Sequence, residues 1–308
     1  AGCAPNAPTQ QNRMNKRMKA TILARMTLSL TRRSLFASPG LVLAQSLLPG
    51  PPDSAERRAP IAALEKKVAG LPDKFERGRH RTASGWPIPY RLFRPQPASG
   101  KLPLVVYLHG SGGLGDDNAK QITGGNLIPA NLWATASLQQ RHPCFIVAPQ
   151  TDRGWLKYAT LDVPAGTRPQ VVPGLGEGAA ACVELIEKLL GELAIDERRI
   201  YLTGQSMGGG GTWNLLAHRG ELFAAAVPYC GSMSLDTGAE NPRIPVWNFH
   251  GDADDTVNVK ISRDRIAARR RAGGQPRATE YAGVGHMVSP WACTEPDLPE
   301  WLFAQKRS

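Results

Sequence analysis

The chain has 308 residues, of which 42% are hydrophobic and 20% are charged, an ordinary composition for a soluble globular protein with one large domain or two small ones. Its formal net charge is +11, but residues 1–50 contain seven Arg and Lys residues and no acidic residue, so the remaining chain carries only +4. Because the basic charge comes mostly from this segment, and no basic stripe interleaved with aromatic residues follows it, the composition excludes nucleic acid as an expected partner.

The N-terminal segment is expected to be a targeting sequence. Residues 31–36 read T-R-R-S-L-F, and the pair Arg32-Arg33 precedes a short apolar run, a pattern that resembles a twin-arginine export signal. The run is too short and too interrupted by Pro and Gly to span a bilayer, so no stable membrane insertion is expected. We therefore predict a leader and disordered linker over residues 1–60, a folded domain over residues 61–308, and a periplasmic or secreted protein. If the segment is instead a basic tail with a chance Arg pair, the protein is cytoplasmic.

The cysteine spacing argues against metal and redox sites. The chain has five cysteines and no C-x-x-C pair, so neither a zinc site nor a thioredoxin-like site is expected. Cys144 and Cys182 fall in apolar segments and are expected to be free, buried thiols. Export would permit a disulfide between Cys230 and Cys293, but the spacing of the cysteines alone does not decide whether this bond forms.

In chain order, short apolar runs bounded by Gly or Pro predict β-strands from about residue 75 onward. Residues 86–93 are expected to form the second arm of an opening hairpin. Further strands are expected at residues 104–108, 144–148, 200–203, 224–229, 246–250 and, from a weaker pattern, 278–281. The uninterrupted apolar run at residues 104–108 is typical of a sheet that helices cover on both faces.

Helical patterns alternate with these strands. Residues 177–193 repeat apolar side chains at helical spacing, residues 212–219 follow a run of glycines, and residues 259–272 combine a few apolar positions with many arginines. The run of three arginines at 269–271 is expected to be a solvated helix end, which the helix dipole favours. The alternation of strands and helices predicts an α/β fold with a mostly parallel central sheet and helices on both faces.

One serine lies in a glycine-rich setting that points to chemistry. Residues 204–208 read G-Q-S-M-G, which fits G-x-S-x-G between a predicted strand and a predicted helix. Such a turn raises Ser206 above the sheet as a nucleophile, and it requires the small residues Gly204 and Gly208 on either side. Gly209 is expected to let the helix approach the sheet. A phosphate-binding loop of the G-x-x-x-x-G-K-[ST] type is excluded, because no lysine is present.

A serine nucleophile needs a histidine base held by a carboxylate, and in this fold the chain order is Ser, acid, His. Three histidines follow Ser206. His218 is expected at the surface of the helix, and His250, which ends a strand before a Gly turn, is expected to be a structural partner of its loop. His286 lies in a glycine-flanked loop after the last strand, and it is therefore predicted to be the base.

The acid and the oxyanion donors are expected in two other loops. The loop after the strand at 246–250 contains three candidate acids, Asp252, Asp254 and Asp255. All three lie close to the end of the strand, so their position in the chain does not distinguish between them. A tetrahedral intermediate also needs two N–H donors for its oxyanion. One is expected from Met207, the residue after the nucleophile, and the other from Ser111 in the glycine-rich loop at 109–118.

Together these segments resemble the α/β-hydrolase superfamily, in particular bacterial esterases of the phospholipase/carboxylesterase and dienelactone-hydrolase-like group, several of which are labelled as predicted peptidases with prolyl-oligopeptidase-like domains. The resemblance runs from about residue 75 to residue 301 and rests on L-P-L-V-V-Y-L-H-G-S-G-G, F-I-V-A-P-Q, R-I-Y-L-T-G-Q-S-M-G-G, F-A-A-A-V-P-Y-C-G, I-P-V-W-N-F-H-G-D-A-D-D-T-V and G-V-G-H. It implies that Asp254, four residues after the histidine of H-G-x-x-D-x-x-V, is the catalytic acid. It also implies that Ser111, after the family's His-Gly pair, is an oxyanion residue.

The sequence departs from this family at two places that bear on the substrate pocket. The family often carries a bulky residue, commonly Tyr, at the position of Gly210, which is therefore a candidate substrate-binding position. Residues 287–289 read M-V-S, where many members read N-S-W or D-S-W.

Two further features bear on the size of the substrate. The chain between residues 231 and 243 is too short for a helical cap domain, which favours an open site and short-chain acyl groups. The segment 150–176 is rich in Pro and Gly and follows a strand end. It either roofs the pocket or forms a surface loop with partly buried aromatic residues, and Trp155 within it is a candidate substrate-binding residue.

The sequence thus predicts a catalytic domain of the α/β-hydrolase type at residues 61–308, a serine esterase that acts on small-molecule esters through an acyl-serine intermediate. No metal and no organic cofactor are expected, and the sequence does not determine the oligomeric state. The alternatives are a serine peptidase of the prolyl-oligopeptidase-like type, and an esterase for feruloyl, acetyl-polysaccharide or hydroxybutyrate esters. A non-catalytic binding protein on the same scaffold is a third, which the intact Ser, Asp and His argue against.

Overall fold

The computed structural model describes residues 43–45, 54–96, 100–164, 167, 169–232 and 241–308. The contacts divide the chain into Ala1–Leu41 and Val42–Ser308, and all described residues belong to the second unit. The predicted export signal with Arg32 and Arg33 therefore lies outside the described residues, and it stays a prediction. Among the described helices, none is both long enough and apolar enough to cross a membrane.

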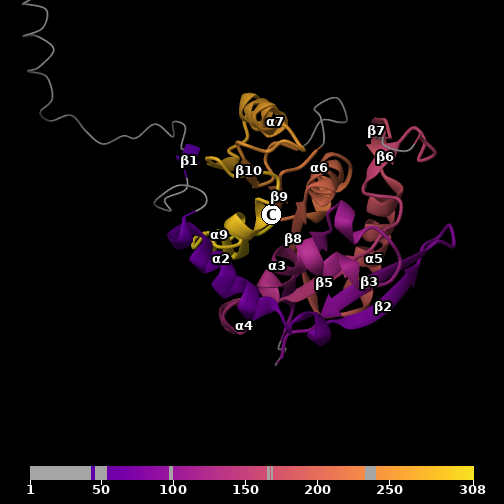
Figure 1. Cartoon of the computed structure of the whole chain (residues 1–308). Coiled ribbons are helices and arrows are strands. Elements are labelled where there is room, and N and C mark those ends of the chain that lie inside the picture. Colours follow the sequence, from indigo (N-terminus) through magenta and orange to yellow (C-terminus); the bar gives the residue numbers. More distant parts are fainter. Residues whose placement is uncertain (1–42, 46–53, 97–99, 165–166, 168, 233–240) are drawn as a thin grey trace, which may run out of the picture. The chain divides into compact units, whose positions relative to one another are not determined.

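A twisted, mostly parallel sheet forms the centre of the described part (Figure 1). Its strands are arranged in the order β1-β11-β10-β9-β8-β4-β5-β3-β2. Their bounds are β1 Leu43–Gln45, β2 Glu76–Arg81, β3 Pro87–Phe93, β4 Leu102–Leu108, β5 Phe145–Pro149, β8 Ile195–Gln205, β9 Ala225–Tyr229, β10 Trp247–Gly251 and β11 Arg277–Tyr281. In this spatial order, all neighbouring strands from β1 at the edge through β11, β10, β9, β8 and β4 to β5 are parallel. Strand β3 pairs antiparallel with both β5 and β2. The mostly parallel α/β sheet that the sequence predicted is confirmed.

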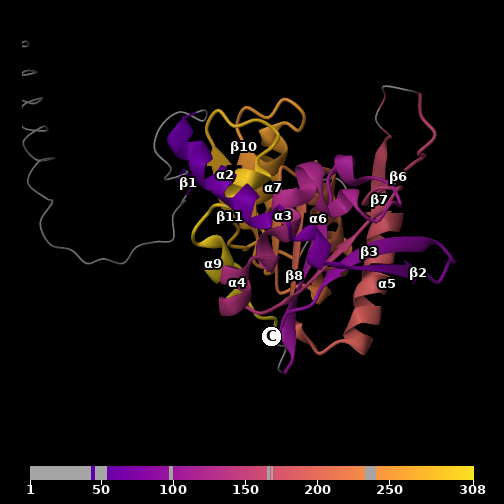
Figure 2. The same cartoon turned by 60° about the horizontal axis from the view of Figure 1, so that its bottom comes forward.

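Helices cover both faces of this sheet (Figure 2). The first face packs against α2 Ala55–Val68, α3 Leu127–Asn131, α4 Ala136–Arg141, α8 Ser289–Ala292 and α9 Leu298–Phe303. The second face packs against α5 Glu177–Glu192, α6 Met207–Arg219 and α7 Val259–Arg271. Side chains of one strand alternate between the two cores, so that Val105 and Tyr107 of β4 lie in the first and Val106 and Leu108 in the second. This double burial explains the uninterrupted apolar run at residues 104–108.

The structure differs from the sequence prediction mainly where helices are polar or glycine-rich. Helix α6 begins at Met207 rather than at residue 212, because packing against two strands outweighs the low helix propensity of its glycines. Helix α2 was not predicted at all. It begins at Ala55, inside the segment expected to be leader and linker. Strand β1 also lies within that segment. The boundary expected at residue 60 thus falls within a helix.

The segment at residues 150–176 contains a second, two-stranded sheet where a loop was expected. Strand β6 Leu156–Tyr158 pairs antiparallel with β7 Val171–Leu175. The hairpin extends from the main body beside α5 and α6 (Figure 1). It therefore holds the chain just before it, around Trp155, close to the start of α6.

Candidate active site

Ser206 sits at the sharp turn between β8 and α6. Its backbone has φ 54° and ψ −115°, a conformation that a residue with a side chain adopts only at an energetic cost. The turn is held by a hydrogen bond of 2.9 Å from Ser206 N–H to Tyr229 O of the neighbouring strand β9. The structure therefore contains the strained strand-to-helix turn that the motif predicted.

The glycines around this serine are explained by close backbone approaches. A Cβ atom at Gly204 would overlap with the carbonyl oxygen of Gly208, and one at Gly208 would overlap with the carbonyl oxygen of Leu108 on β4. At Gly209 the added atom would lie 2.5 Å from Tyr229 O of β9. Gly204 and Gly208 thus make room for the turn and for helix–strand contact, and Gly209 lets α6 lie directly on the sheet.

Ser206, His286 and Asp254 are joined by two hydrogen bonds. His286 Nε2 lies 2.7 Å from Ser206 Oγ, and His286 Nδ1 lies 2.8 Å from Asp254 Oδ2. The three residues come from the turn after β8, the loop after β11 and the loop after β10. Because these are parallel neighbours or near neighbours in the sheet, their carboxyl ends bring the three loops to one edge.

The structure also distinguishes the three candidate acids. Asp252 accepts the Gly283 N–H at 2.6 Å, which joins the loop after β10 to the loop after β11. Asp255 is exposed and accepts a hydrogen bond from the neighbouring hydroxyl of Thr256. Only Asp254 contacts the His286 ring, in agreement with what the family resemblance implied.

The carboxylate of Asp254 is buried and held by four donors. Oδ1 accepts the N–H groups of Thr256 and Val257 at 2.9 and 2.8 Å, while Oδ2 accepts from His286 and, at 3.0 Å, from His250 Nε2. Burial raises the pKa of this carboxyl, but the hydrogen bonds from Val257, His286 and Thr256 outweigh it, so the net pKa lies below the usual value. The group is therefore a carboxylate near neutral pH.

His250 supports this carboxylate from the side opposite to His286. Its side chain is fully buried, its Nε2 also lies 2.9 Å from Val257 O, and its Nδ1 lies 2.7 Å from Ser262 Oγ. Two oxygen acceptors around Nε2 require that this nitrogen carries the hydrogen, and burial lowers the pKa of the ring. A neutral His250 thus donates to Asp254, which fits its expected role as a partner of the loop.

The two predicted oxyanion donors lie in adjacent loops. Ser111 is the first residue of a short 3₁₀ turn after β4, and Met207 is the first residue of α6. A backbone N–H at the first position of a helix has no acceptor within that helix. The strands β4 and β8 are paired up to Leu108 and Gly204, so the two loops leave the sheet side by side.

A buried amide network, which the sequence did not reveal, connects these loops. Asn126 Oδ1 accepts hydrogen bonds from Gly110 N–H at 3.0 Å, from Tyr107 Oη at 2.9 Å and from Gln205 Nε2 at 3.1 Å. Gln205 directly precedes Ser206, and its Oε1 accepts the hydroxyl hydrogen of Ser289, three residues after His286. The network therefore joins the loop that precedes Ser111, the turn at Ser206 and the loop that carries His286. Its members are scattered through the chain, so no local motif signals them.

Trp155 is not a substrate-contacting roof, and it is not a partly exposed surface residue either. Its side chain is fully buried, and its indole N–H donates to His109 O at 2.9 Å, next to the predicted oxyanion residues. A Cβ atom at Gly211 would overlap with Trp155 Cβ, which accounts for a glycine that the turn itself does not require. The physical reason is that the β6–β7 hairpin directs the ring inward, where it packs edge-on against His109 at 4.9 Å.

Gly210 lies in the first turn of α6, in contact with two segments. A Cβ atom there would lie 3.1 Å from Ser232 Oγ and 3.5 Å from Leu156 Cδ1. The residues that follow Ser232, up to position 240, lie outside the described part of the chain. The role of Gly210 in the pocket wall therefore stays a prediction.

Cys230, Asp254 and His286 are close enough to be considered as metal ligands, since one ligand atom from each lies within 4.8 Å of the others. Burial raises the pKa of the Cys230 thiol to about 12, and the thiol donates to His286 O at 3.3 Å. A metal ion would have to deprotonate this thiol and break the hydrogen bond between His286 and Asp254. The donor set is better suited to holding the histidine. The four described cysteines are free and buried, so a bridge between Cys230 and Cys293 is not present.

Comparisons with known proteins find similarity to hydrolases. The model of the prolyl oligopeptidase family (Peptidase_S9) matches residues 177–248, from the start of α5 to the second residue of β10. The bifunctional acetylxylan esterase/xylanase of Neocallimastix patriciarum is 31% identical over 77 residues, which are 25% of this chain and 12% of that protein.

Solved structures extend the likeness over most of the described part. A thermostable esterase is 38% identical with a TM-score of 0.66, over 76% of this chain and 64% of that one. The esterase Est2 of the planctomycete Thermogutta terrifontis is 16% identical with a TM-score of 0.54, over 75% of this chain and 92% of that one, which shows the shared fold. The chain thus spans 12% and 64% of the first two of these relatives.

Proposed function

Because the chain belongs to the α/β-hydrolase superfamily, we propose that it is a serine hydrolase that cleaves carboxylic esters through an acyl-serine intermediate. The observation that carries the proposal is the continuous hydrogen-bond chain from Ser206 Oγ through both nitrogens of His286 to Asp254. A serine hydroxyl is a weak nucleophile by itself, and this arrangement is the one that activates it.

The reaction proceeds through two transfers at one serine. His286 Nε2 takes the proton of Ser206 Oγ as the oxygen attacks the ester carbonyl, and Asp254 stabilises the imidazolium that forms. The N–H groups of Met207 and Ser111 donate to the oxyanion of the tetrahedral intermediate. His286 then returns the proton to the departing alcohol, and water attacks the acyl-serine by the same route.

A short acyl group is proposed because the chain leaves little room for a cap over the site. Only residues 232–242 separate the end of the β9 region from the approach to β10, and the thermostable esterase is 38% identical to this chain. Esters are also easier acyl donors than amides. The match to the prolyl oligopeptidase family keeps a peptidase as the second candidate.

The test compares Ser206→Ala with the wild type on p-nitrophenyl acetate and on a peptide anilide. We expect the wild type to release nitrophenol, and the variant to lose kcat by a factor on the order of 10⁴ to 10⁶, as when a triad serine is removed. Cleavage of the anilide but not of the ester would favour the peptidase. Unchanged ester hydrolysis by Ser206→Ala would refute the mechanism.

A further inference from the structure

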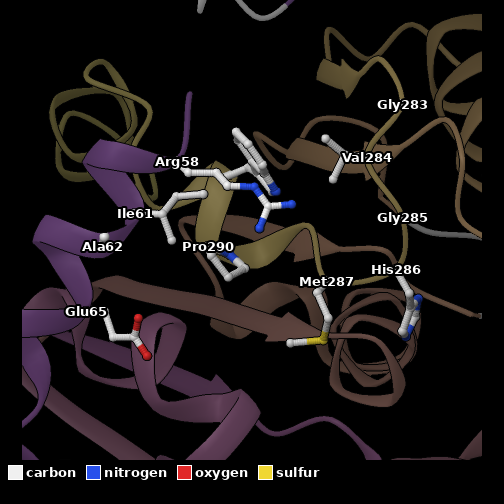
Figure 3. Close-up of a pocket in the computed structure, with 11 residues that line it drawn as sticks. Arg58, Ile61, Ala62, Glu65, Gly283, Val284, Gly285, His286, Met287 and Pro290 are labelled. Carbon is white, nitrogen blue, oxygen red and sulfur yellow. The ribbon is translucent and has the colours of Figure 1, made fainter. Parts of the chain in front are cut away.

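A cavity of about 340 Å³ lies between helix α7 and the strands β10 and β11, on the second face of the sheet. Its volume falls within the range of about 300–1,000 Å³ that is usual for small-molecule sites. It shares no lining residue with a larger cavity of about 610 Å³, which lies between helix α2 and the loop of His286 (Figure 3). Neither Ser206, Asp254 nor His286 lines the smaller cavity, so the proposed mechanism gives it no role.

A buried side-chain amide without a hydrogen-bond partner faces this smaller cavity. Side chains alternate along β10, so that Trp247 and Phe249 lie in the first core while Asn248 points to the opposite face, toward α7. Only 2% of Asn248 is exposed, and within the described part of the chain its Oδ1 accepts no hydrogen bond. A buried polar atom of this kind is costly unless water or a ligand satisfies it. Since Asn248 lines the cavity, the group that satisfies its amide must lie there.

The hydroxyl group of Ser262 is a second acceptor on the wall of this cavity. The residue is 3% exposed, and its Oγ lies 2.7 Å from His250 Nδ1. Because His250 carries its hydrogen on Nε2, its Nδ1 must accept, and Ser262 donates its only hydroxyl hydrogen to the ring. The lone pairs of Ser262 Oγ therefore remain available to a donor in the cavity. Two such acceptors favour a ligand with hydroxyl groups.

The charged residues that line the cavity leave one positive charge. Arg263 and Glu280 form a bidentate ion pair, with Nε 3.0 Å from Oε1 and Nη2 2.6 Å from Oε2, so their charges cancel. Arg270 is half-buried and forms no ion pair among the residues that the structure describes. Its planar guanidinium matches a carboxylate. An ammonium group is disfavoured, because the carboxylate of Glu280 is already paired.

We propose that this cavity is a second small-molecule site and that its ligand is a short-chain hydroxycarboxylate. The carboxylate pairs with Arg270, and hydroxyl groups donate to Asn248 Oδ1 and Ser262 Oγ. The short carbon chain lies against the apolar side chains of Ile266 and Ala278. The inference does not depend on the proposed ester hydrolysis, so its failure would leave that function untouched.

Three probes with the same three-carbon skeleton test the class of ligand. Glycerate carries a carboxylate and two hydroxyl groups, propionate lacks the hydroxyl groups, and glycerol lacks the carboxylate. Each probe is titrated into the full-length protein, and binding is followed by the NMR shifts of the ¹⁵N-labelled backbone. We expect glycerate to bind with a Kd on the order of 1 mM, and propionate and glycerol to bind at least about tenfold more weakly.

Two adjacent arginines provide matched variants. Arg270 lines the cavity, whereas Arg271, the next residue of α7, is exposed and does not line it. Arg270→Gln should weaken glycerate binding about tenfold or more, because it removes the charge that the carboxylate meets. Arg271→Gln removes the same charge outside the cavity, and its Kd should stay within about twofold of the wild type. Asn248→Leu keeps a similar volume without the unpartnered amide, so it should fold and should bind glycerate no better than propionate.

The proposal is wrong if the wild type binds glycerate, propionate and glycerol alike, or binds none of them up to about 100 mM, since the cavity then holds only water. Equal effects of Arg270→Gln and Arg271→Gln would mean that glycerate binds elsewhere on the protein, and this also overturns the proposal. If Asn248→Leu does not fold, the two arginine variants still decide between these outcomes.

Discussion

The Asp254 carboxylate, which contacts the His286 ring, is fixed in place by hydrogen bonds to both of its oxygens. Four hydrogen bonds from Thr256, Val257, His250 and His286 fix both carboxylate oxygens. A carboxylate placed in this way selects the His286 tautomer with hydrogen on Nδ1, which leaves Nε2 free to accept the serine proton. Both the negative charge and the fixed position of the Asp254 side chain therefore determine the orientation and the tautomer of the His286 ring.

Asp254→Asn is predicted to lower kcat about 10⁴-fold, because an amide at this position no longer enforces the correct tautomer. The measurement is steady-state hydrolysis of p-nitrophenyl acetate. Asp255→Asn is the matched control, since Asp255 is exposed and does not contact His286, and its kcat should stay within about twofold. A loss of less than tenfold in Asp254→Asn would mean that another group orients the histidine.

Asn126 is predicted to be a positioning residue for the oxyanion loop. Without the amide oxygen, the N–H of Gly110 loses its acceptor and the neighbouring Ser111 loses its fixed place. We expect Asn126→Ala to lower kcat roughly 10- to 100-fold with little change in KM, which is less than the loss of a donor itself. Binding of a boronic acid, which mimics the tetrahedral intermediate, should weaken by a similar factor.

Asn131→Ala separates this effect from simple destabilisation. Asn131 is equally buried, but its hydrogen bonds go to two other backbone carbonyl oxygens, those of Ile122 and Leu127. The control should unfold more easily and keep its kcat. If both variants lose stability and neither loses boronic acid affinity, Asn126 is structural only.

At the level of elements, α6 illustrates how packing determines a helix that its sequence alone disfavours. Four consecutive glycines follow Met207 at the start of the helix, and each lowers its intrinsic stability by about 0.5–1 kcal/mol relative to Ala. The first three bring the helix close to β4, to β9 and to the segment at Ser232, and the fourth accommodates Trp155. The local cost is offset by contacts that exist only in the folded domain.

Glycine substitutions in two helices are therefore predicted to have opposite effects on stability. Gly208→Ala should lower the free energy of unfolding by about 3 kcal/mol, because the added methyl group overlaps with backbone atoms that cannot move freely. Gly191→Ala in α5 should raise it by about 0.5–1 kcal/mol, since nothing lies within 4 Å of the new atom. Urea unfolding measures both, and equal effects would contradict the packing argument.

For the whole molecule, buried histidines connect folding stability to pH. His109 has no exposed surface; its Nδ1 donates to Gly110 O and its Nε2 accepts the Thr151 N–H. Burial lowers the pKa of this ring to about 4, and it also lowers the pKa of His250. Both rings are therefore neutral in the folded protein at pH values where they become protonated in the unfolded chain.

The unfolding free energy is predicted to fall as the pH is lowered from about 6.5 to about 4. In that window the unfolded state binds a proton at His109 that the folded state does not bind, which costs roughly 3 kcal/mol over the whole range. The depressed pKa of Asp254 acts in a lower window, because its contribution is lost only as the pH falls through that pKa. Urea unfolding between pH 7.5 and 4.5 tests this, and His109→Asn should show a shallower slope. An equal slope in that variant would assign the effect to other groups.

The order of elements and the strained turn at Ser206 were predictable from the sequence, because their signals are local. The apolar runs gave β4, β8, β9 and β10 to within a few residues except at the start of β8, and the spacing of glycines around Ser206 depends only on neighbouring backbone atoms. His286 followed from its place after the last strand. In each case the physical constraint acts over a short stretch of chain.

Only the tertiary structure decided the features that depend on distant segments. It brought Asp254, which proximity in the chain did not distinguish and only the family resemblance had indicated, to the His286 ring. It also turned Trp155 into the core, joined Asn126 to Gln205 and placed α2 across a cavity from the histidine loop. The physical reason is that hydrogen bonds and burial depend on separations in space between segments that lie far apart in the chain, about which local composition and periodicity carry no information.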